Sequence, residues 1–298
     1  MSKFKPSVFR GAATALITPF RNGAIDFKAL SQMIEYQIKA GIDALVIAGT
    51  TGESCTLSDA EHHELLSRAI EYIDDRVPAI AGTGSNDTAH AVEMSKYAAS
   101  LGYDALLVVT PYYNKATPQG LIKSYLTIAD ASDAPIIPYN VPSRTGCNIT
   151  LPVYRELSRH ENIVAVKEAS GNISAVAQLI DECGQYLDVY SGNDDQTLPI
   201  LALGGVGVIS VASNIIPREM TELCRLWFEG KWEQSREMQM KYLALMNTMF
   251  CEVNPIPVKT AAAMLGMCTD EIRLPLCAPT EENKQKIVHT LKAAGLIQ

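Results

Sequence analysis

Short hydrophobic segments alternate with longer amphipathic segments along most of this chain. The short segments are rich in β-branched and other apolar residues, and in the longer ones apolar residues recur every three or four positions. Strand-length apolar segments separated by helical patterns are typical of a parallel sheet with helical connections. We predict eight strands, at residues 14–18, 44–48, 78–82, 105–109, 135–139, 163–167, 188–192 and 207–211.

Local signals mark where two of the helices begin or end. In residues 27–41 the apolar spacing is helical, and Gly41 supplies a stop. Ser58 and Glu61 have the spacing of a capping box ahead of the apolar positions of the next helix. The segment GTTGESCTL, residues 49–57, is therefore predicted to be a loop that leads from a strand into a helix.

Eight strand and helix units can either close into a barrel or spread into an open sheet. An open dinucleotide-binding sheet carries the spacing GxGxxG after an early strand, and residues 82–87 and 204–209 do not have this spacing. We therefore predict an α/β fold, a (β/α)8 TIM barrel of residues 1–224. Residues 225–298 contain further helical patterns without a Gly-, Ser- or Pro-rich linker, and they predict a C-terminal helical extension packed on the barrel.

The composition is that of a folded, acidic protein. Of the 298 residues, 47% are hydrophobic and 19% are charged, which is enough to bury a large core. The net charge of −8 and the lack of long basic runs predict no nucleic-acid partner. The first apolar stretch stops at Pro19, so we expect neither a signal peptide nor a membrane span, and a cytoplasmic location. Seven cysteines without a CxxC pair indicate free thiols in a reducing compartment.

Metal and cofactor chemistry have little support in the sequence. The five histidines form no HxH or HExxH pattern, and the adjacent His62 and His63 face apart on a helix. The chain has no phosphate-binding lysine loop and no GxSxG nucleophile elbow. We therefore predict no metal site and no cofactor.

Lys167 closes the sixth predicted strand, and in barrel enzymes the chemistry takes place at this end of the strands. A lysine there either carries its charge out to solvent or gives the charge up. In the second case its pKa falls from about 10.4 to near 7 or 8, and the neutral amine can form an imine with a carbonyl substrate. The position of Lys167 alone leaves both interpretations open.

Other strand ends carry further candidates, each with a simpler structural alternative. GTTGE, residues 49–53, offers hydroxyls and backbone amides that suit a carboxylate, but it is also a plain helix entry. Tyr139 ends the fifth strand and suits proton transfer, or it is an interfacial core tyrosine. Arg144 presents a fork for a carboxylate, or is solvated. Tyr112 and Tyr113 are adjacent and point in different directions, and either can serve for packing alone.

Taken together, several of these segments resemble the dihydrodipicolinate synthase branch of the pyruvate-dependent class I aldolase and N-acetylneuraminate lyase superfamily. The similarity extends nearly from end to end, in the family's order and at compatible spacings. The segments that carry it are GTTGE, AGTGSN, TPYYN, YNVPSRTG, VKEASGN, GGVGVISV and NPIPVK, the last at residues 254–259.

The resemblance implies a role for each matching residue. Lys167 forms the Schiff base with pyruvate, and Thr50 and Thr51 hold the pyruvate carboxylate. Tyr139, Thr50 and Tyr113 form a proton relay, with Tyr113 reaching into the neighbouring subunit of a tight dimer. The remaining implied roles belong to Arg144, which receives the carboxylate of L-aspartate 4-semialdehyde, and to Gly192 and Ile209, whose backbones line the pyruvate pocket.

By the same resemblance, the chain is expected to condense pyruvate with L-aspartate 4-semialdehyde to 4-hydroxy-tetrahydrodipicolinate, on the diaminopimelate route to lysine. Members of the family are usually homotetramers built from two tight dimers and need no cofactor. The alternatives are an N-acetylneuraminate lyase, a related 2-keto-3-deoxy sugar acid aldolase, and a non-enzymatic regulator on the same barrel. Arg144 and the paired threonines favour the synthase, because the lyase usually has serine-threonine there and lacks the arginine.

A lysine-binding regulatory site is also implied, because some members of the family are inhibited by L-lysine at the dimer interface. Asp59 and His90 depart from the pattern of the inhibited members, which have a histidine and a glutamate there. We therefore expect weak or absent inhibition. The positions that correspond to this site, besides Asp59, are Ser54, Cys55, His62, Asn86, His90 and Tyr112.

Overall fold

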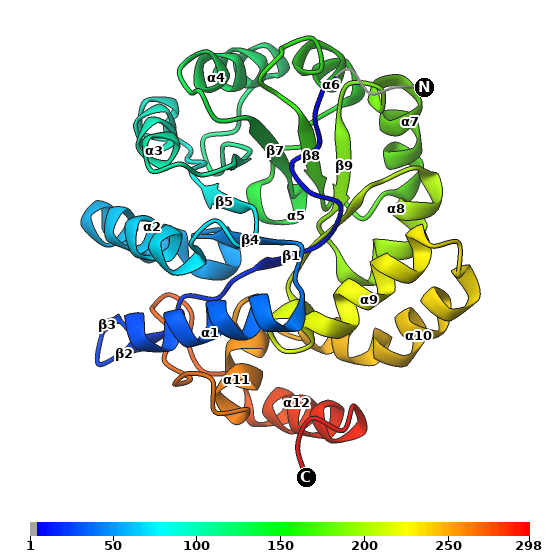
Figure 1. The fold of residues 1–298 in the computed structure, drawn as a ribbon. Helices are drawn as coiled ribbons and strands as arrows, with labels where there is room; N and C mark the ends of the chain where they lie inside the picture. Colours follow the sequence, from blue (N-terminus) through cyan, green and yellow to red (C-terminus); the bar gives the residue numbers. More distant parts are fainter. Residues whose placement is uncertain (1–4) are drawn as a thin grey trace. The chain divides into compact units, whose positions relative to one another are not determined.

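Eight parallel strands form a closed barrel in the computed structural model, which describes residues 5–298 (Figure 1). Around the barrel the strands follow the order β1-β10-β9-β8-β7-β6-β5-β4. Nearly every strand residue is buried, which explains why the strands appear as continuous apolar segments in the sequence. The predicted barrel is confirmed. Its strands are β1 (Gly11–Ala15), β4 (Ala44–Ile47), β5 (Ala79–Gly82), β6 (Ala105–Val109), β7 (Ile136–Asn140), β8 (Ala165–Glu168), β9 (Asp188–Ser191) and β10 (Gly207–Ser210).

Helices follow the strands as the periodicity predicts. Ser58 caps α2 in a complete capping box with Glu61, and Gly41 ends α1 with a positive φ of 86°. Both predicted boundary signals are thus confirmed. The helices of the repeating part are α1 (Phe27–Ala40), α2 (Asp59–Ile73), α3 (Thr88–Ser100), α4 (Pro118–Asp130), α5 (Pro142–Thr145), α6 (Leu151–Leu157), α7 (Ile173–Cys183), α8 (Thr197–Leu203) and α9 (Pro217–Phe228).

The first strand lies earlier than predicted, at Gly11–Ala15 rather than at residues 14–18. Every residue from 11 to 20 is buried, so hydrophobicity alone could not place the ends of the strand. The ends of the strand are set by its pairing with β4, in which Ala13 lies opposite Ala44. The prediction was wrong by three residues.

A small hairpin that was not predicted follows β1. Its strands β2 (Phe20–Arg21) and β3 (Ala24–Ile25) are antiparallel and are joined by Asn22 and Gly23. Both turn residues have positive φ, 56° and 82°, as the tight turns preferred by hairpins require. The Asn-Gly pair was the available signal for this turn.

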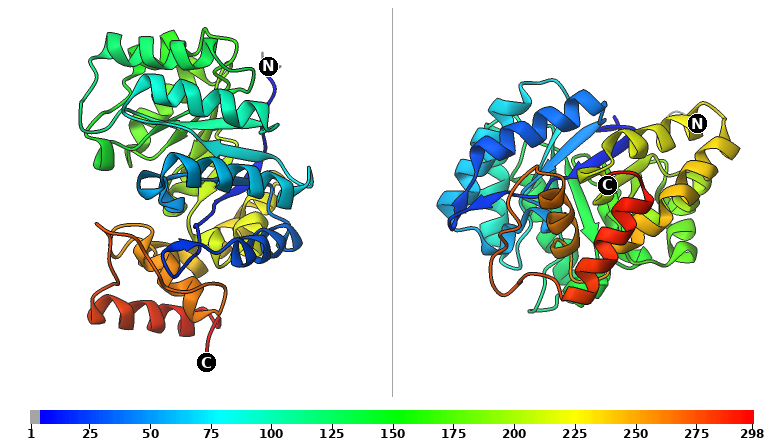
Figure 2. Two further views of the ribbon diagram at one scale, coloured as in Figure 1. Left: turned by 90° about the vertical axis from the view of Figure 1, so that its left-hand side faces the viewer. Right: turned by 90° about the horizontal axis from the view of Figure 1, so that it is seen from below.

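The chain forms two compact units. The first contains the residues up to Gly11 together with 78–209, and the second contains 12–77 and 210–298. In the first unit α4 packs on α6, and α6 packs on α7. In the second unit α9 packs on α10 (Trp232–Thr248), which in turn contacts α12 (Glu281–Ala293) (Figure 2). Helix α12 also packs on α11 (Ile256–Met264). The predicted division between residues 224 and 225 stays a prediction, and position 224 lies within α9.

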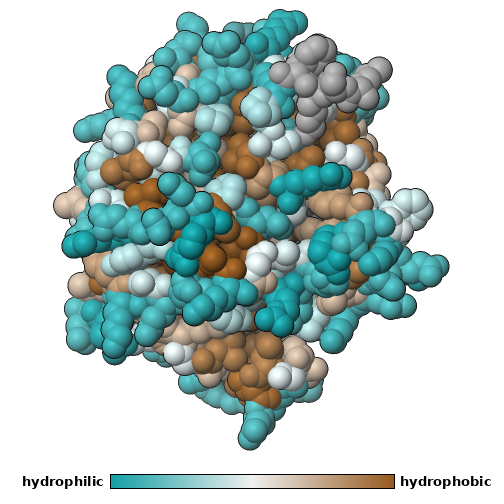
Figure 3. Space-filling model, viewed as in Figure 1, coloured by the Kyte–Doolittle hydropathy of each residue, from teal (hydrophilic) through white to brown (hydrophobic). Residues whose placement is uncertain are grey.

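Polar residues predominate on the face drawn in Figure 3, with smaller hydrophobic areas between them. Within residues 5–298, no helix combines the length and the hydrophobicity needed to cross a bilayer. No disulfide joins the cysteines within residues 5–298, and four of the seven are at least partly exposed to solvent.

Candidate active site

Lys167 is buried at the C-terminal end of β8, with 4% of its surface exposed. It therefore does not extend to solvent, and of the two interpretations that the sequence left open, the structure favours the loss of charge. Burial lowers the pKa of Lys167 to about 7, because an ammonium loses its hydration there; the Asp194 carboxylate opposes the shift and the Arg144 guanidinium adds to it. A substantial fraction of this side chain is a neutral, nucleophilic amine near pH 7.

Tyr139 lies beside this amine on the neighbouring strand. It is paired in register with Lys167 across β7 and β8, and the lysine nitrogen lies 4.3 Å from the centroid of the tyrosine ring. Burial raises the pKa of Tyr139 to about 12; the nearby Arg144 lowers it and Glu168 raises it further. The phenol therefore keeps its proton at neutral pH and can donate it to a group beside Lys167.

Gly192 leaves room for the Lys167 side chain. Its backbone N–H donates to the carbonyl oxygen of Glu168 at 2.8 Å, directly after β9. A Cβ at this position would lie 3.2 Å from Cε of Lys167 and 2.7 Å from Cβ of Ala169. Only a residue without a side chain fits here. The predicted place of Gly192 in the pocket wall stays a prediction.

Asp194 is a charged residue of this site that the sequence reasoning missed. It begins the 3₁₀ helix η3 (Asp194–Gln196), is 1% exposed, and raises the pKa of Lys167 by its charge. It follows shortly after β9, and no feature of the sequence indicated that this carboxylate is buried near the lysine. Arg144 lies on the short helix α5 and is exposed.

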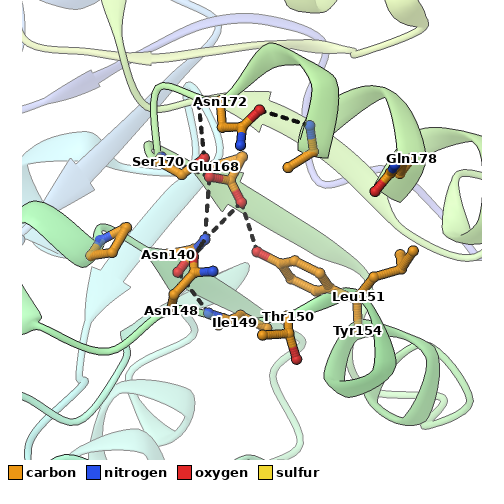
Figure 4. Close-up of a pocket in the computed structure, with 12 residues that line it drawn as sticks. Asn140, Asn148, Ile149, Thr150, Leu151, Tyr154, Glu168, Ser170, Asn172 and Gln178 are labelled. Carbon is orange, nitrogen blue, oxygen red and sulfur yellow. Dashed lines mark hydrogen bonds between the residues drawn. The ribbon is translucent and has the colours of Figure 1, made fainter.

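A buried carboxylate lies on the strand position after Lys167. Glu168 accepts hydrogen bonds from Nδ2 of Asn140 at 3.0 Å, from the hydroxyl of Tyr154 at 2.8 Å and from the backbone N–H of Ser170 at 2.7 Å (Figure 4). Successive strand residues point to opposite faces, so this network braces the outer side of β8. It lies beside a cavity of about 390 Å³, which Asn148 and Thr150 also line.

The GTTGE segment belongs to the second unit and forms two short 3₁₀ helices, η1 (Thr50–Gly52) and η2 (Ser54–Thr56). Thr51 is 2% exposed, and its Oγ1 accepts a hydrogen bond from Nδ2 of Asn254 at 2.9 Å. Thr50 is half-buried. A residue about 200 positions later in the chain therefore helps to hold this loop.

The remaining predicted residues occupy varied environments. Ile209 is buried in β10. Tyr113 is 91% exposed and has a positive φ of 71°, which is uncommon for a bulky residue. Tyr112 is half-buried.

The residues of the implied lysine-binding site fall into two groups. Ser54, Cys55 and His62 belong to the second unit, and His62 is buried in α2. Asn86, His90 and Tyr112 belong to the first unit. This site stays a prediction.

Among residues 5–298, the His, Cys, Asp and Glu side chains form no group of three that could hold a metal ion.

A closed barrel with a buried lysine of lowered pKa beside a tyrosine defines the class of lysine-dependent enzymes that act on carbonyl compounds. The chain belongs to the dihydrodipicolinate synthetase family, whose model matches residues 8–294. It is 48% identical over 290 residues to the 4-hydroxy-tetrahydrodipicolinate synthase of Geotalea uraniireducens, covering 97% of this chain and 100% of that protein.

Solved structures agree with this assignment. The dihydrodipicolinate synthase of Aquifex aeolicus matches with a TM-score of 0.95 and 45% identity, covering 97% of this chain and 99% of that one. The chloride-inhibited enzyme of Acinetobacter baumannii, crystallised in complex with pyruvate, matches with a TM-score of 0.94 and 40% identity, covering 97% and 99%.

Proposed function

We propose that this chain catalyses the 4-hydroxy-tetrahydrodipicolinate synthase reaction, the condensation of pyruvate with L-aspartate 4-semialdehyde. The observation that carries the proposal is the buried Lys167, whose pKa of about 7 makes it a nucleophile beside the protonated phenol of Tyr139. Relatives of similar length that are named as this synthase support the choice of reaction. The product leads to diaminopimelate and lysine, and the proposed location is the cytoplasm.

The proposed reaction begins with the Lys167 amine and the ketone group of pyruvate. The Lys167 nitrogen attacks the carbonyl carbon of pyruvate, and the oxygen leaves as water to give a protonated imine. The positive nitrogen accepts electrons as the methyl group loses a proton, which yields an enamine. The enamine carbon attacks the aldehyde, whose oxygen takes up a proton. The amine of the second substrate then adds to the imine carbon and expels Lys167, which closes the six-membered ring.

The proton transfers are assigned to Tyr139, with Thr50 and Tyr113 as the other members of the relay. Tyr139 suits this role because its phenol stays protonated at neutral pH and lies against the lysine. Thr50 and Thr51 are assigned to the pyruvate carboxylate, and Gly192 and Ile209 to the pocket wall. The fit of Gly192 against Lys167 supports its part of the assignment.

Arg144 is assigned to the carboxylate of the aldehyde substrate. It is exposed on α5, and its positive charge lowers the pKa of both Lys167 and Tyr139. The guanidinium therefore has an electrostatic effect on both reacting side chains. This arginine separates the proposed synthase from the lyase and sugar acid aldolases of the superfamily. A non-enzymatic role is the less favoured alternative, because the lysine and the tyrosine are both present.

We further propose a homotetramer made of two tight dimers, in which Tyr113 reaches into the partner's site. The exposure of this large aromatic side chain, held on a left-handed backbone, supports a contact with another subunit. Light scattering of the purified protein tests the oligomeric state, and steady-state turnover with pyruvate and either L-aspartate 4-semialdehyde or N-acetylmannosamine tests the reaction. Turnover of the sugar alone would refute the proposed synthase.

A further inference from the structure

The NPIPVK segment, residues 254–259, makes two side-chain contacts with the loop at residues 49–57. Nδ2 of Asn254 donates to Oγ1 of Thr51 at 2.9 Å, and Nζ of Lys259 donates to Oε1 of Glu53 at 2.5 Å. The partners are 203 and 206 residues apart in the sequence. A distant segment therefore holds this loop at two positions, within η1 and at the junction of η1 and η2.

The contact between Lys259 and Glu53 is a buried ion pair. Their side chains are 1% and 2% exposed. The lysine nitrogen also lies 4.0 Å from the centroid of the Phe20 ring, and Oε2 of the carboxylate accepts the backbone N–H of Arg273 at 3.1 Å. Each charge thus has a partner and a second favourable contact, which fixes the geometry of both side chains.

Glu53 holds the loop in a conformation that a free chain disfavours. Its φ is 56°, in the left-handed region, and it joins η1 to η2. The preceding Gly52 lies close to the chain behind it: a Cβ there would come within 3.2 Å of the Leu16 carbonyl oxygen, and the Thr18 hydroxyl donates to the Gly52 carbonyl at 2.7 Å. A residue other than glycine keeps this backbone conformation only where its surroundings enforce it.

The contact between Asn254 and Thr51 fixes the direction of a hydroxyl. The amide nitrogen of Asn254 can only donate, so Oγ1 of Thr51 accepts this bond. The Thr51 hydroxyl can therefore donate its own hydrogen to a different acceptor. Because Thr51 is buried, water does not compete for this hydroxyl, and its orientation is fixed.

We propose that Asn254 and Lys259 are positioning residues for the proposed pyruvate-carboxylate site, Asn254 acting through Thr51 and Lys259 through Glu53. This inference rests on the proposed function. Neither residue is required to touch the substrate, because each acts on the loop that presents Thr50 and Thr51. Their loss is therefore expected to weaken pyruvate binding while the chemical step at Lys167 persists at saturating pyruvate.

Asn254→Ala gives the primary test, because the hydrogen bond to Thr51 that it removes is neutral and no unpaired charge is left behind. We expect the KM for pyruvate to rise by roughly tenfold, the change that corresponds to one lost hydrogen bond, with kcat within about threefold and the KM for the aldehyde unchanged. Asn283→Ala is the matched control. Its amide donates to the Glu252 carboxylate at 2.7 Å rather than to the loop at residues 49–57, and its loss is expected to leave the kinetic constants unchanged.

For Lys259 the test uses the double variant Lys259→Met with Glu53→Gln, because the single change would leave an unpaired buried carboxylate. We expect a folded protein with a raised pyruvate KM and a nearly unchanged kcat. A wild-type KM in the folded double variant, or a double variant that cannot fold, would refute a positioning role for Lys259. An unchanged pyruvate KM in Asn254→Ala would refute the role of Asn254.

Borohydride trapping of pyruvate on the wild-type chain separates these outcomes from failure of the proposed function. If the wild type forms no adduct at Lys167, the function itself is wrong. If it forms the adduct but the variants keep the wild-type KM, only the positioning role is wrong.

Discussion

Tyr139 and Lys167 lie opposite each other on β7 and β8, with the lysine nitrogen 4.3 Å from the centroid of the tyrosine ring. Their shared burial moves the two pKa values apart, to about 7 for the lysine and about 12 for the tyrosine. In both cases the cause is the loss of hydration of the charged form, which is the ammonium for lysine and the phenolate for tyrosine. Near neutral pH the pair therefore offers a neutral amine and a protonated phenol together.

The first prediction is a pH dependence set by Lys167. Protonated lysine cannot attack a carbonyl, so the rate of imine formation should fall as the pH drops through about 7 and level off above it. The initial rate of pyruvate trapping by cyanoborohydride, measured from pH 5 to 9, gives the midpoint. Asp194→Asn should move the midpoint down, because the Asp194 carboxylate raises the lysine pKa. A rate that still climbs with a midpoint near 10 would contradict the lowered pKa.

The second prediction concerns the space that Gly192 leaves for the lysine. Gly192→Ala should displace Lys167 and Ala169, destabilise the chain by about 1–3 kcal/mol, and slow imine formation on the order of tenfold. Denaturant unfolding and trapping rates measure the two effects. Gly120→Ala, on helix α4, is the matched control, since a Cβ there would lie 3.4 Å from Oγ1 of Thr117 and 3.9 Å from Cβ of Ala116. Equal trapping rates for Gly192→Ala and wild type would disprove the steric account.

The third prediction separates the two carboxylate sites. Arg144→Ala should lower kcat/KM for L-aspartate 4-semialdehyde by about 10- to 100-fold, the value of about 1.5–3 kcal/mol for a charged hydrogen bond. Pyruvate trapping at saturation should remain, with its pH midpoint shifted upward, because Arg144 helps to lower the pKa of Lys167. Loss of trapping would mean that Arg144 serves pyruvate instead.

The fourth prediction concerns regulation. Millimolar L-lysine should leave most of the activity intact, because Asp59 and His90 depart from the pattern of the lysine-inhibited members of the family. The initial velocity at several lysine concentrations, with pyruvate near its KM, measures this. His90→Glu should increase the inhibition if the implied site is right. Strong inhibition of the wild-type chain would overturn the expectation.

The barrel could be predicted from the sequence because its signals are local. Strand-length apolar segments, helical periodicity and the capping box at Ser58 each depend on residues that are near one another in the chain. The end of β1 could not be predicted in this way, because the register with β4 decides it within a longer buried run. The hairpin at Asn22 and Gly23 did have a local signal, which went unused.

The candidate residues at strand ends could also be found from the sequence, but their environment could not. Whether Lys167 is buried or extends to solvent depends on packing against residues that are distant in the chain, such as Gly192 and Asp194. The same holds for Asn254 and Lys259, which contact a loop more than 200 residues earlier.

The central claim is that Lys167 forms a Schiff base with pyruvate, and trapping followed by peptide mapping tests it most directly. The chain is incubated with pyruvate and borohydride, and the adduct is located by mass spectrometry of the intact protein and of its peptides. Lys259 is an internal control, because it is also buried but is paired with Glu53. We predict one reduced pyruvate adduct, on Lys167, that is lost in Lys167→Met. An unmodified chain, or an adduct confined to another lysine, would contradict the proposed mechanism.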